Sequence, residues 1–203
     1  MDKKVIVFDF DKTLTYRDTI FQFYFFTSKK NINFFFKCLF YFILMVLFKF
    51  QIISNDYLKF KGFNLFLKGL KVEDIEIKAK KFVSKINFNN LYKSYNFRED
   101  SEMIFIISAS YEIYLKYIFP ENVKIIGTTF ISKNGIAEEF KFNCYSTNKY
   151  LMLSDNGIKN ITCCYTDSYS DKSLAEISNQ IIIVNKDKFI KCNDLKEFNL
   201  YFK

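Results

Sequence analysis

Short apolar runs recur along the chain and predict the strands of one sheet. Five of them have the length of strands and contain β-branched or aromatic residues, and helix-like stretches such as 111–119 and 171–179 lie between them. The runs are residues 5–8, 103–108, 123–126, 161–165 and 181–184. Because strands and helices alternate in this way, we predict an α/β fold with a doubly wound parallel sheet.

Two patterns interrupt this alternation. The turn sequence Ser-Lys-Asn-Gly at 132–135 separates two β-like segments and predicts a small β-hairpin. The interval 16–95 contains no convincing strand, but its apolar residues recur at helical spacing. Examples are Phe60, Phe63, Leu67 and Leu70, followed by Ile75, Ala79, Phe82 and Ile86. We therefore predict a helical cap at 16–95, inserted into a core domain formed by 1–15 and 96–203.

The most apolar segment of the chain runs from Phe34 to Phe50. Its charge-free part is residues 38–48, which lies between Lys37 and Lys49 and is eleven residues long. A helix that spans a bilayer needs about 20 apolar residues. We therefore expect, in this order, a helix buried in the cap, a helix that lies on a membrane surface, and a spanning helix.

Composition narrows the functional classes. The 203-residue chain has a formal net charge of +8, but its cations are almost all lysine, with arginine only at Arg17 and Arg98, so we predict no nucleic-acid partner. The five cysteines form no CxxC pair and there is no histidine, which argues against a zinc site and excludes a histidine base. This cysteine usage indicates a reducing compartment, so we expect a cytoplasmic protein, with membrane association as the alternative.

Two carboxylates directly follow the first predicted strand, at Asp9 and Asp11. Side chains alternate along an extended chain, so we expect Asp9, Asp11 and Thr13 on one side, with Phe10 and Lys12 on the other. The carboxyl ends of parallel strands are where such sheets bind ligands. Two crowded acids call for a cation between them, and without histidine or paired cysteine the ligands must be oxygens, which suits Mg²⁺.

Three further polar features follow later apolar runs or helix-like stretches. Ser108 ends the second strand, Lys149 opens a helix-like run, and Asp167 and Asp171 follow the fourth strand four residues apart. Each feature alone is weak, because acids often cap helices, serines often lie in turns and most lysines are on the surface. Their order along the chain is more informative.

In this order of acid pair, hydroxyl, lysine and acid pair, the chain resembles the haloacid dehalogenase-like (HAD) superfamily of phosphohydrolases. It is most similar to the phosphoserine-phosphatase-like branch, subfamily IB, which has a helical cap between the first and second motifs. Ser-Ala-Ser at 108–110 and Asp-Ser-x-x-Asp at 167–171 are typical of that branch. The resemblance covers the chain outside the cap and implies a Rossmann-like core.

The resemblance also implies roles for individual residues. Asp9 corresponds to the nucleophile that becomes a phosphoaspartate, and Asp11 to the general acid/base, for which we expect a raised pKa. Ser108 and Lys149 correspond to the phosphate-binding groups. Magnesium ligands would come from Asp9, the main-chain carbonyl of Asp11, and Asp167, with Asp171, Thr13 and Ser168 in support.

Two positions leave alternatives open. Lys141, Lys149 and Lys159 all fall in the interval of the family's lysine, and we choose Lys149 because it follows the hairpin and opens a helix-like run. Lys12 stands where many relatives have glycine, so its side chain is expected to point away from the metal.

We therefore predict a Mg²⁺-dependent phosphomonoester hydrolase whose substrate is a small-molecule phosphate or a lipid head group. Arg17 and Asp18 follow the first motif, where cap residues of relatives reach the substrate, and are our predicted substrate contacts. The apolar stretch Phe34 to Phe48 is similar to that of the phosphatidylglycerophosphatase C family, and lysines nearby in the cap would suit an anionic membrane surface. These are Lys59, Lys61, Lys68 and Lys71.

The alternative is a non-catalytic relative or a phospho-accepting signalling domain of the receiver type. Receiver domains also place acids, a hydroxyl, a lysine and Mg²⁺ at the end of a parallel sheet. They are shorter, lack an inserted cap and order their acids differently. The intact carboxylates of this chain also argue against a catalytically inactive relative.

Overall fold

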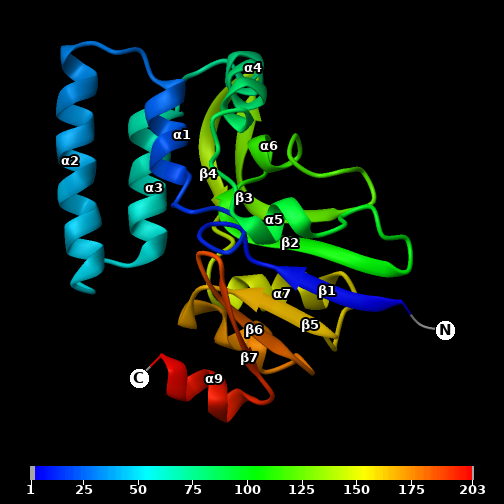
Figure 1. Cartoon of the computed structure of the whole chain (residues 1–203). Coiled ribbons are helices and arrows are strands. Elements are labelled where there is room, and N and C mark those ends of the chain that lie inside the picture. Colours follow the sequence, from blue (N-terminus) through cyan, green and yellow to red (C-terminus); the bar gives the residue numbers. More distant parts are fainter. Residues whose placement is uncertain (1–2, 203) are drawn as a thin grey trace.

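Residues 3–202, which the computed structural model describes, form a sheet of seven strands with helices on both faces (Figure 1). The strands are β1 (Lys4–Phe8), β2 (Glu102–Tyr111), β3 (Lys124–Lys133), β4 (Ile136–Phe142), β5 (Cys163–Thr166), β6 (Ile181–Asn185) and β7 (Lys188–Cys192). Their order across the sheet is β4-β3-β2-β1-β5-β6-β7. The five central strands are parallel and the two edge strands are antiparallel, which confirms the predicted fold class.

Both faces of β1 are apolar, as expected for a strand in the middle of a parallel sheet. Ile6 and Phe8 pack on one face, and Val7 packs on the other. The Val7 face is covered by helices α7 (Thr147–Asp155) and α8 (Lys172–Ala175), which contribute Leu153 and Leu174. This double burial explains why the predicted strands appear as continuous apolar runs and not as alternating ones.

The position of β1 decides where a ligand can bind. The chain leaves β1, builds β2 and β3 on one side, and then crosses over to build β5 and β6 on the other. The strand order therefore reverses next to β1, and a crevice forms beyond the carboxyl ends of β1 and its two neighbours.

The predicted hairpin is confirmed, and it is an extension of β3 itself. Asn134 and Gly135 both have positive φ, at 51° and 75°, as a tight two-residue turn of type I′ requires. The hairpin also holds the cap, because Gly69 N donates to Ala137 O at 2.8 Å and Ala137 N donates to Leu70 O at 2.9 Å.

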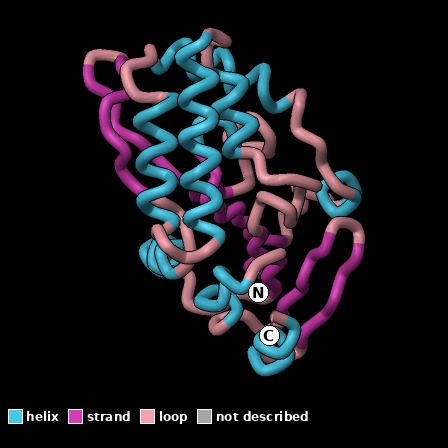
Figure 2. Tube along the Cα trace, turned by 90° about the vertical axis from the view of Figure 1, so that its left-hand side faces the viewer, coloured by secondary structure: helices cyan, strands magenta, loops and turns pink. Residues whose placement is uncertain are grey.

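Between β1 and β2 the described chain forms helices and no strand, as predicted. The helices are α1 (Ile20–Thr27), α2 (Ile32–Lys49), α3 (Asn55–Phe66), α4 (Val72–Val83) and α5 (Asn90–Ser94). Figure 2 views the molecule from the side on which α2 lies in Figure 1, and shows α1, α2 and α3 side by side. The boundaries of a separate cap domain stay a prediction.

The C-terminal part differs from the prediction. Helix α6 (Glu112–Leu115) and helix α8 are each one turn long. Both predicted helical stretches continue as tighter turns, in which Tyr117 N donates to Tyr114 O and Ile177 N donates to Leu174 O. Strand β7 and helix α9 (Leu195–Tyr201) were not predicted. Only the last residue of β7 is buried among its five, so an edge position leaves this strand without the apolar pattern of the others.

The prediction that α2 is buried is wrong for most of its surface. Phe34, Tyr41 and Leu44 are its buried residues, and they face α1 and α3. The opposite side of the helix is exposed along its whole length. By length and composition α2 is also the one helix among residues 3–202 that could cross a membrane.

Candidate active site

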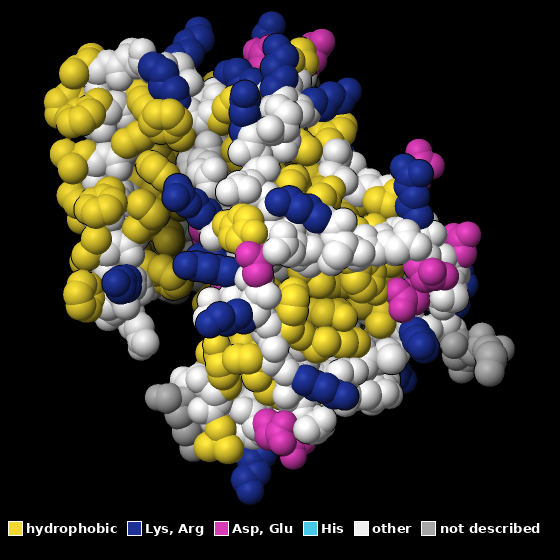
Figure 3. Space-filling view, in the orientation of Figure 1, with side chains coloured by type: hydrophobic (Ala, Val, Ile, Leu, Met, Phe, Trp, Pro, Cys, Tyr) yellow, Lys and Arg dark blue, Asp and Glu magenta, His cyan; other side chains and the backbone are white. Residues whose placement is uncertain are grey.

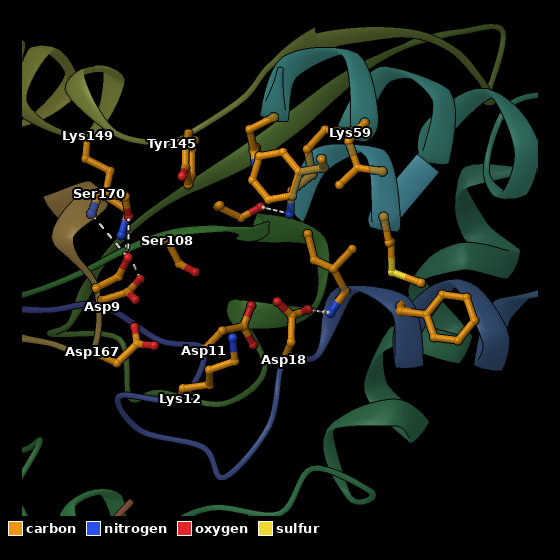
Figure 4. A pocket seen from close by; sticks show the side chains of 18 of the residues that line it. Asp9, Asp11, Lys12, Asp18, Lys59, Ser108, Tyr145, Lys149, Asp167 and Ser170 are labelled. Carbon is orange, nitrogen blue, oxygen red and sulfur yellow. Dashed lines mark hydrogen bonds and ion pairs between the residues drawn. The ribbon is translucent and has the colours of Figure 1, made fainter. Parts of the chain in front are cut away.

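A cavity of about 400 Å³ opens beyond the ends of β1, β2 and β5, between the sheet and helices α1 to α3 (Figure 4). One part of its lining is polar, and the charged residues there are Asp9, Asp11, Lys12, Asp18, Lys59, Lys149 and Asp167. The other part is apolar and comes from the cap, with Ile20, Phe21, Tyr41, Met45, Phe48 and Leu58. Residues predicted from five separate places in the sequence therefore meet in one cavity.

Asp9 is the first residue after β1 and is 7 % exposed. Its main-chain N donates to Tyr165 O at 2.9 Å, which extends the pairing of β1 with β5 by one step. Its side-chain Oδ1 accepts a hydrogen bond from Lys149 Nζ at 2.8 Å. The carboxylate is thus fixed in position by a sheet bond on one side and an ammonium on the other.

Lys149 projects from the first turn of α7 and is buried. Its Nζ lies 2.7 Å from Asp171 Oδ1, in addition to its bond with Asp9. Burial alone would lower the pKa of this ammonium, but the two carboxylates raise it above its ordinary value. Lys141 and Lys159 are exposed, so the structure places the chosen lysine of the three in the cavity.

Asp171 is fully buried behind Lys149. Thr166 Oγ1 donates to its Oδ2 at 2.7 Å, and Lys149 occupies its Oδ1. Asp171 does not line the cavity, so it acts on the site through Lys149. This position agrees with the supporting role that the family resemblance implies for Asp171.

Asp11 accepts hydrogen bonds at both carboxylate oxygens. Oδ1 accepts from Thr19 N at 2.8 Å and from Thr19 Oγ1 at 2.7 Å, and Oδ2 accepts from Ser110 Oγ at 2.5 Å. Burial and the nearby Asp18 raise the pKa of Asp11 to about 7, against the opposing effect of these bonds and of Lys59. The predicted upward shift is therefore present.

Asp167 follows β5 and lies near Asp9 in the lining of the cavity (Figure 4). Burial, then the charges of Asp9 and Asp171, raise its pKa to about 8, although Lys12 and Lys149 act in the opposite direction. Burial is the main cause, and the neighbouring carboxylates add to it.

The donor set fits a small divalent cation. Among residues 3–202 no group of three or more acidic, cysteine or histidine side chains lies close enough to enclose a metal. Mg²⁺ commonly takes one or two carboxylates and completes its shell with water and phosphate oxygens. Asp9 and Asp167 are the carboxylates of this cavity that could hold such an ion, and the main-chain carbonyl of Asp11 is a further oxygen in the loop after Asp9.

Ser108 and Ser168 supply two hydroxyls to the cavity lining. Ser108 was expected to end the second strand, but it lies within β2, which continues to Tyr111, and Ser168 lies in the loop after β5. Ser108 is buried in the cavity wall, and its Oγ accepts from Ser110 N at 3.1 Å, which leaves its own proton free for an anion. The pairing of β2 with β3 is irregular just after Ile107, where the Ser-Ala-Ser segment begins. Ser168 Oγ accepts from Ser170 N at 3.2 Å and shapes the loop after Asp167.

The loop after Asp9 corrects two predictions. Lys12 lines the cavity, although we expected it to point away, and Thr13 is buried outside the cavity, although we expected it beside the acids. The alternation of an extended strand ends at Phe10, because Leu14 N donates to Phe10 O and closes a helical turn. Lys12 has φ +60° there, which explains why glycine suits this position in relatives.

Of the two predicted substrate contacts, only Asp18 lies in the cavity. Asp18 lines the cavity, and its Oδ1 also accepts from Ile20 N at 3.1 Å at the start of α1. Arg17 is exposed and does not line the cavity, so the structure does not place it beside the other predicted site residues, and its role as a contact stays a prediction.

Lys59 of α3 is a site residue that the sequence analysis placed wrongly on a basic surface. It is 7 % exposed, lines the cavity, and donates from Nζ to Ala109 O at 3.1 Å. Burial lowers its pKa, while Asp18, Asp11 and Asp9 act against that shift. A signal was present, because Lys59 precedes the buried Phe63 and Phe66 at helical spacing, within an apolar stripe.

Comparisons with known proteins agree with this geometry. Residues 6–176 match the family described as haloacid dehalogenase-like hydrolase. Comparison with curated protein sequences gave no match.

Among solved structures, a substrate-bound phosphoserine phosphatase complex is 18 % identical, with a TM-score of 0.63 and full coverage of both chains. A phospho-aspartyl intermediate analogue of phosphoserine phosphatase is 19 % identical, with a TM-score of 0.58 and full coverage of both chains. Phosphoserine phosphatase from T. onnurineus is 21 % identical, with a TM-score of 0.62 and coverage of 100 % of this chain and 98 % of the other. At these identities the structural matches establish a shared fold.

Proposed function

Because this chain belongs to the haloacid dehalogenase-like hydrolase family, we propose that it is a phosphatase that hydrolyses phosphomonoesters through a phosphoaspartate at Asp9. One observation carries the proposal. A buried carboxylate held by Lys149 lies in the same cavity as a second carboxylate, Asp11, whose pKa is raised to about 7. A nucleophile and a proton donor with unequal surroundings are what phosphoryl transfer to the protein needs.

In the first step, a carboxylate oxygen of Asp9 attacks the phosphorus atom. The new oxygen–phosphorus bond forms as the bond to the ester oxygen breaks. Asp11, which is largely protonated below pH 7, gives its proton to the departing alkoxide, so the alcohol leaves neutral. Ser108 and Lys149 stabilise the negative charge of the transferring group, since both lie in the cavity beside Asp9.

In the second step, a water molecule attacks the phosphorus of the phosphoaspartate. Asp11, now ionised, takes the water's proton, and the bond between phosphorus and the Asp9 oxygen breaks. Inorganic phosphate leaves, and both carboxylates return to their first states. The same residue serves as acid and then as base because its pKa lies near neutrality.

Asp9, Asp167 and the main-chain carbonyl of Asp11 would hold Mg²⁺. The ion would neutralise charge on the phosphoryl oxygens and so ease the approach of an anionic nucleophile. The raised pKa of Asp167 supports this assignment, because burial and then the charges of Asp9 and Asp171 disfavour its ionised form, and a cation at that point would offset both effects.

Turnover of an aryl phosphate in the presence of Mg²⁺ tests the proposal. We expect the wild-type protein to release phosphate and Asp9→Asn to lose about 10⁴-fold or more of that rate, as removal of a nucleophile does. Asp155→Asn is the matched control, since it makes the same chemical change at an exposed residue outside the cavity. If wild type, Asp9→Asn and Asp155→Asn all lack turnover, or all release phosphate at the same rate, the proposal fails, and the absence of turnover favours the non-catalytic alternative.

A further inference from the structure

We propose that α2 docks the protein on an anionic lipid surface and that the substrate is a phosphomonoester of a lipid. The docking part stands without any assumption about activity, and the substrate part rests on the proposed phosphatase function. Both parts depend on the two opposite faces of one helix.

The outer face of α2 is apolar, exposed and free of charge over most of its length. It consists of Ile32, Phe35, Phe36, Leu39, Phe40, Phe42, Ile43 and Val46. Phe35 is 60 % exposed and Phe36 is 59 % exposed, although they are among the most apolar side chains. Figure 3 shows the hydrophobic side chains that cover this helix along one edge of the molecule. Leaving such a face in water is unfavourable, so it indicates a binding surface.

Lysines frame this outer face at both ends. Lys49 ends the helix, and a basic cavity of about 340 Å³ lies at its beginning. Its charged lining, within the described residues, is Lys29, Lys37, Lys71, Lys78 and Asp74. Dark-blue side chains gather at that end of α2 in Figure 3.

These lysines have no acidic partners in the described part of the chain. None of the ion pairs there includes any of the five, whereas Lys37 Nζ and Lys78 Nζ donate to main-chain carbonyls of Leu65 and Thr27. Their charge is therefore available to an anionic ligand. Apolar side chains between basic ends are the pattern of a helix that lies in a membrane interface.

Charge favours a lipid surface over a second copy of this chain. Each copy carries a formal charge of +8, so two copies repel one another, and the outer face of α2 contains no acid to pair with the other copy's lysines. An anionic bilayer satisfies both the apolar residues and the lysines.

The helix fits a position on the membrane better than one across it. Eighteen residues of helix are about 27 Å long, and the hydrocarbon core is about 30 Å thick. The face formed by Phe34, Tyr41 and Leu44 is also packed on the cap and would have to detach. A location in the interface leaves this packing intact.

The inner face of α2 connects the docking surface to the chemistry. Tyr41, Met45 and Phe48 follow one another at helical spacing and line the active-site cavity. Phe21 and Leu58 continue this apolar wall, opposite the end that holds Asp9. A phosphomonoester with an alkyl tail matches a cavity that is charged at one end and apolar at the other.

Vesicle binding without substrate tests the docking part. We expect wild-type protein to co-sediment with phosphatidylcholine vesicles that contain phosphatidylglycerol, and to bind pure phosphatidylcholine or vesicles in high salt more weakly. Leu39→Glu with Ile43→Glu should lower the binding constant roughly tenfold or more, because both side chains would enter the interface.

Leu151→Glu with Ile77→Glu is the matched control for this experiment. Leu39 and Leu151 are 49 % and 50 % exposed, and Ile43 and Ile77 are 48 % and 47 % exposed, all on helices. The control should bind like wild type. If the wild type does not bind vesicles, the docking part is overturned. A dimer that Leu39→Glu with Ile43→Glu dissociates, and that the control leaves intact, would assign α2 to self-association instead.

Chain-length dependence tests the substrate part. We expect kcat/KM to be at least roughly tenfold higher for octyl phosphate than for ethyl phosphate, since each buried methylene adds to binding. Met45→Gln should lower that ratio, because it makes the apolar wall polar. Equal values for the two esters contradict a lipid substrate. If neither ester is hydrolysed while vesicle binding persists, the proposed phosphatase function fails and the docking surface stands.

Discussion

Asp9 and Asp11 are the same residue type two positions apart, and their surroundings make them chemically different. Lys149 donates to Asp9 and keeps a positive charge beside it. Asp11 is buried near Asp18 and is bonded to the neutral hydroxyls of Thr19 and Ser110, which do not offset the burial. The first residue is suited to nucleophilic attack and the second to proton transfer.

The proton transfer by Asp11 gives a pH prediction that depends on the leaving group. The protonated form of Asp11 is lost as pH rises through about 7, so kcat/KM for an alkyl phosphate should fall above that pH. An aryl phosphate leaves as a stable phenolate and should not show this fall. Asp11→Asn should lower kcat/KM about 10²- to 10⁴-fold for the alkyl ester and much less for the aryl ester. Parallel profiles for both esters would remove Asp11 as the acid.

Lys149 gives a stability prediction. Lys149→Met leaves Asp9 and Asp171 beside each other without their common cation, and breaking such a buried pair costs about 3–5 kcal/mol. Urea unfolding of the variant should show that loss, and Lys159→Met, at an exposed lysine, should show almost none. Adding Asp171→Asn to Lys149→Met should recover part of the lost stability. If Lys149→Met alone is as stable as the wild type, Lys149 does not form the two ion pairs with Asp9 and Asp171.

Several site residues could be identified from the sequence because they follow apolar runs that form neighbouring strands. Asp9, Ser108 and Asp167 each follow an apolar run, and the sheet order brings those ends together. Lys12 and Thr13 could not be placed, because a helical turn replaces the strand alternation at Phe10. Lys59 was misplaced because its burial depends on the docking of the cap over the sheet.

At the scale of elements, α3 is packed so closely that one glycine is required. A Cβ at Gly62 would lie 2.7 Å from the Tyr24 hydroxyl oxygen. The hydroxyl groups of Tyr24 and Tyr111 are hydrogen-bonded at 2.9 Å, so this ring passes α3 and links α1 to β2. The cap is therefore held to the sheet by a contact that the sequence pattern of α3 does not reveal.

Gly62→Ala tests this contact, because close packing against Tyr24 decides whether the substitution lowers or raises the free energy of unfolding. Alanine in a helix gains up to about 1 kcal/mol over glycine, but forced overlap in a packed core costs about 1–3 kcal/mol. We expect a net loss of unfolding free energy in the wild-type background. In a Tyr24→Leu background the overlap disappears, and the same substitution should be neutral or stabilising. A stabilising effect in both backgrounds would refute the close packing.

The helices and strands also differ in how well their sequences predicted their surroundings. The central strands are buried on both faces, so their apolar runs were sufficient to find them. Helix α2 has apolar residues all round, which predicts burial, but its outer face is exposed. Composition gives the hydrophobicity of a helix but not the partner that covers it.

At the scale of the molecule, the sheet supplies charged groups and the cap closes the cavity over them. Asp167, from the sheet side, has a pKa of about 8 against an ordinary 3.8, so the folded protein without metal binds more protons than the unfolded chain between these values. Stability without metal should therefore fall as pH rises through this window.

Mg²⁺ should act against that loss. The ion competes with the proton at Asp167, so the rise in Tm that Mg²⁺ produces should grow from pH 6 to pH 9. Asp167→Asn should lose most of this rise, and Asp155→Asn should keep it. Thermal unfolding with and without Mg²⁺ measures the effect without substrate. If Mg²⁺ raises the Tm of Asp167→Asn as much as that of the wild type, the ion does not bind at Asp167.

The central claim, that Asp9 takes up a phosphoryl group, can be tested by trapping it. Asp11→Asn protein with Mg²⁺ and an aryl phosphate should complete the first step, whose leaving group needs no proton, and then stall without a base for water. After an acid quench and digestion, mass spectrometry should find the phosphoryl group on the peptide that contains Asp9, and not after Asp9→Asn is added. Phosphate release with no phosphoryl group on Asp9, or with the group on another residue, would contradict the account.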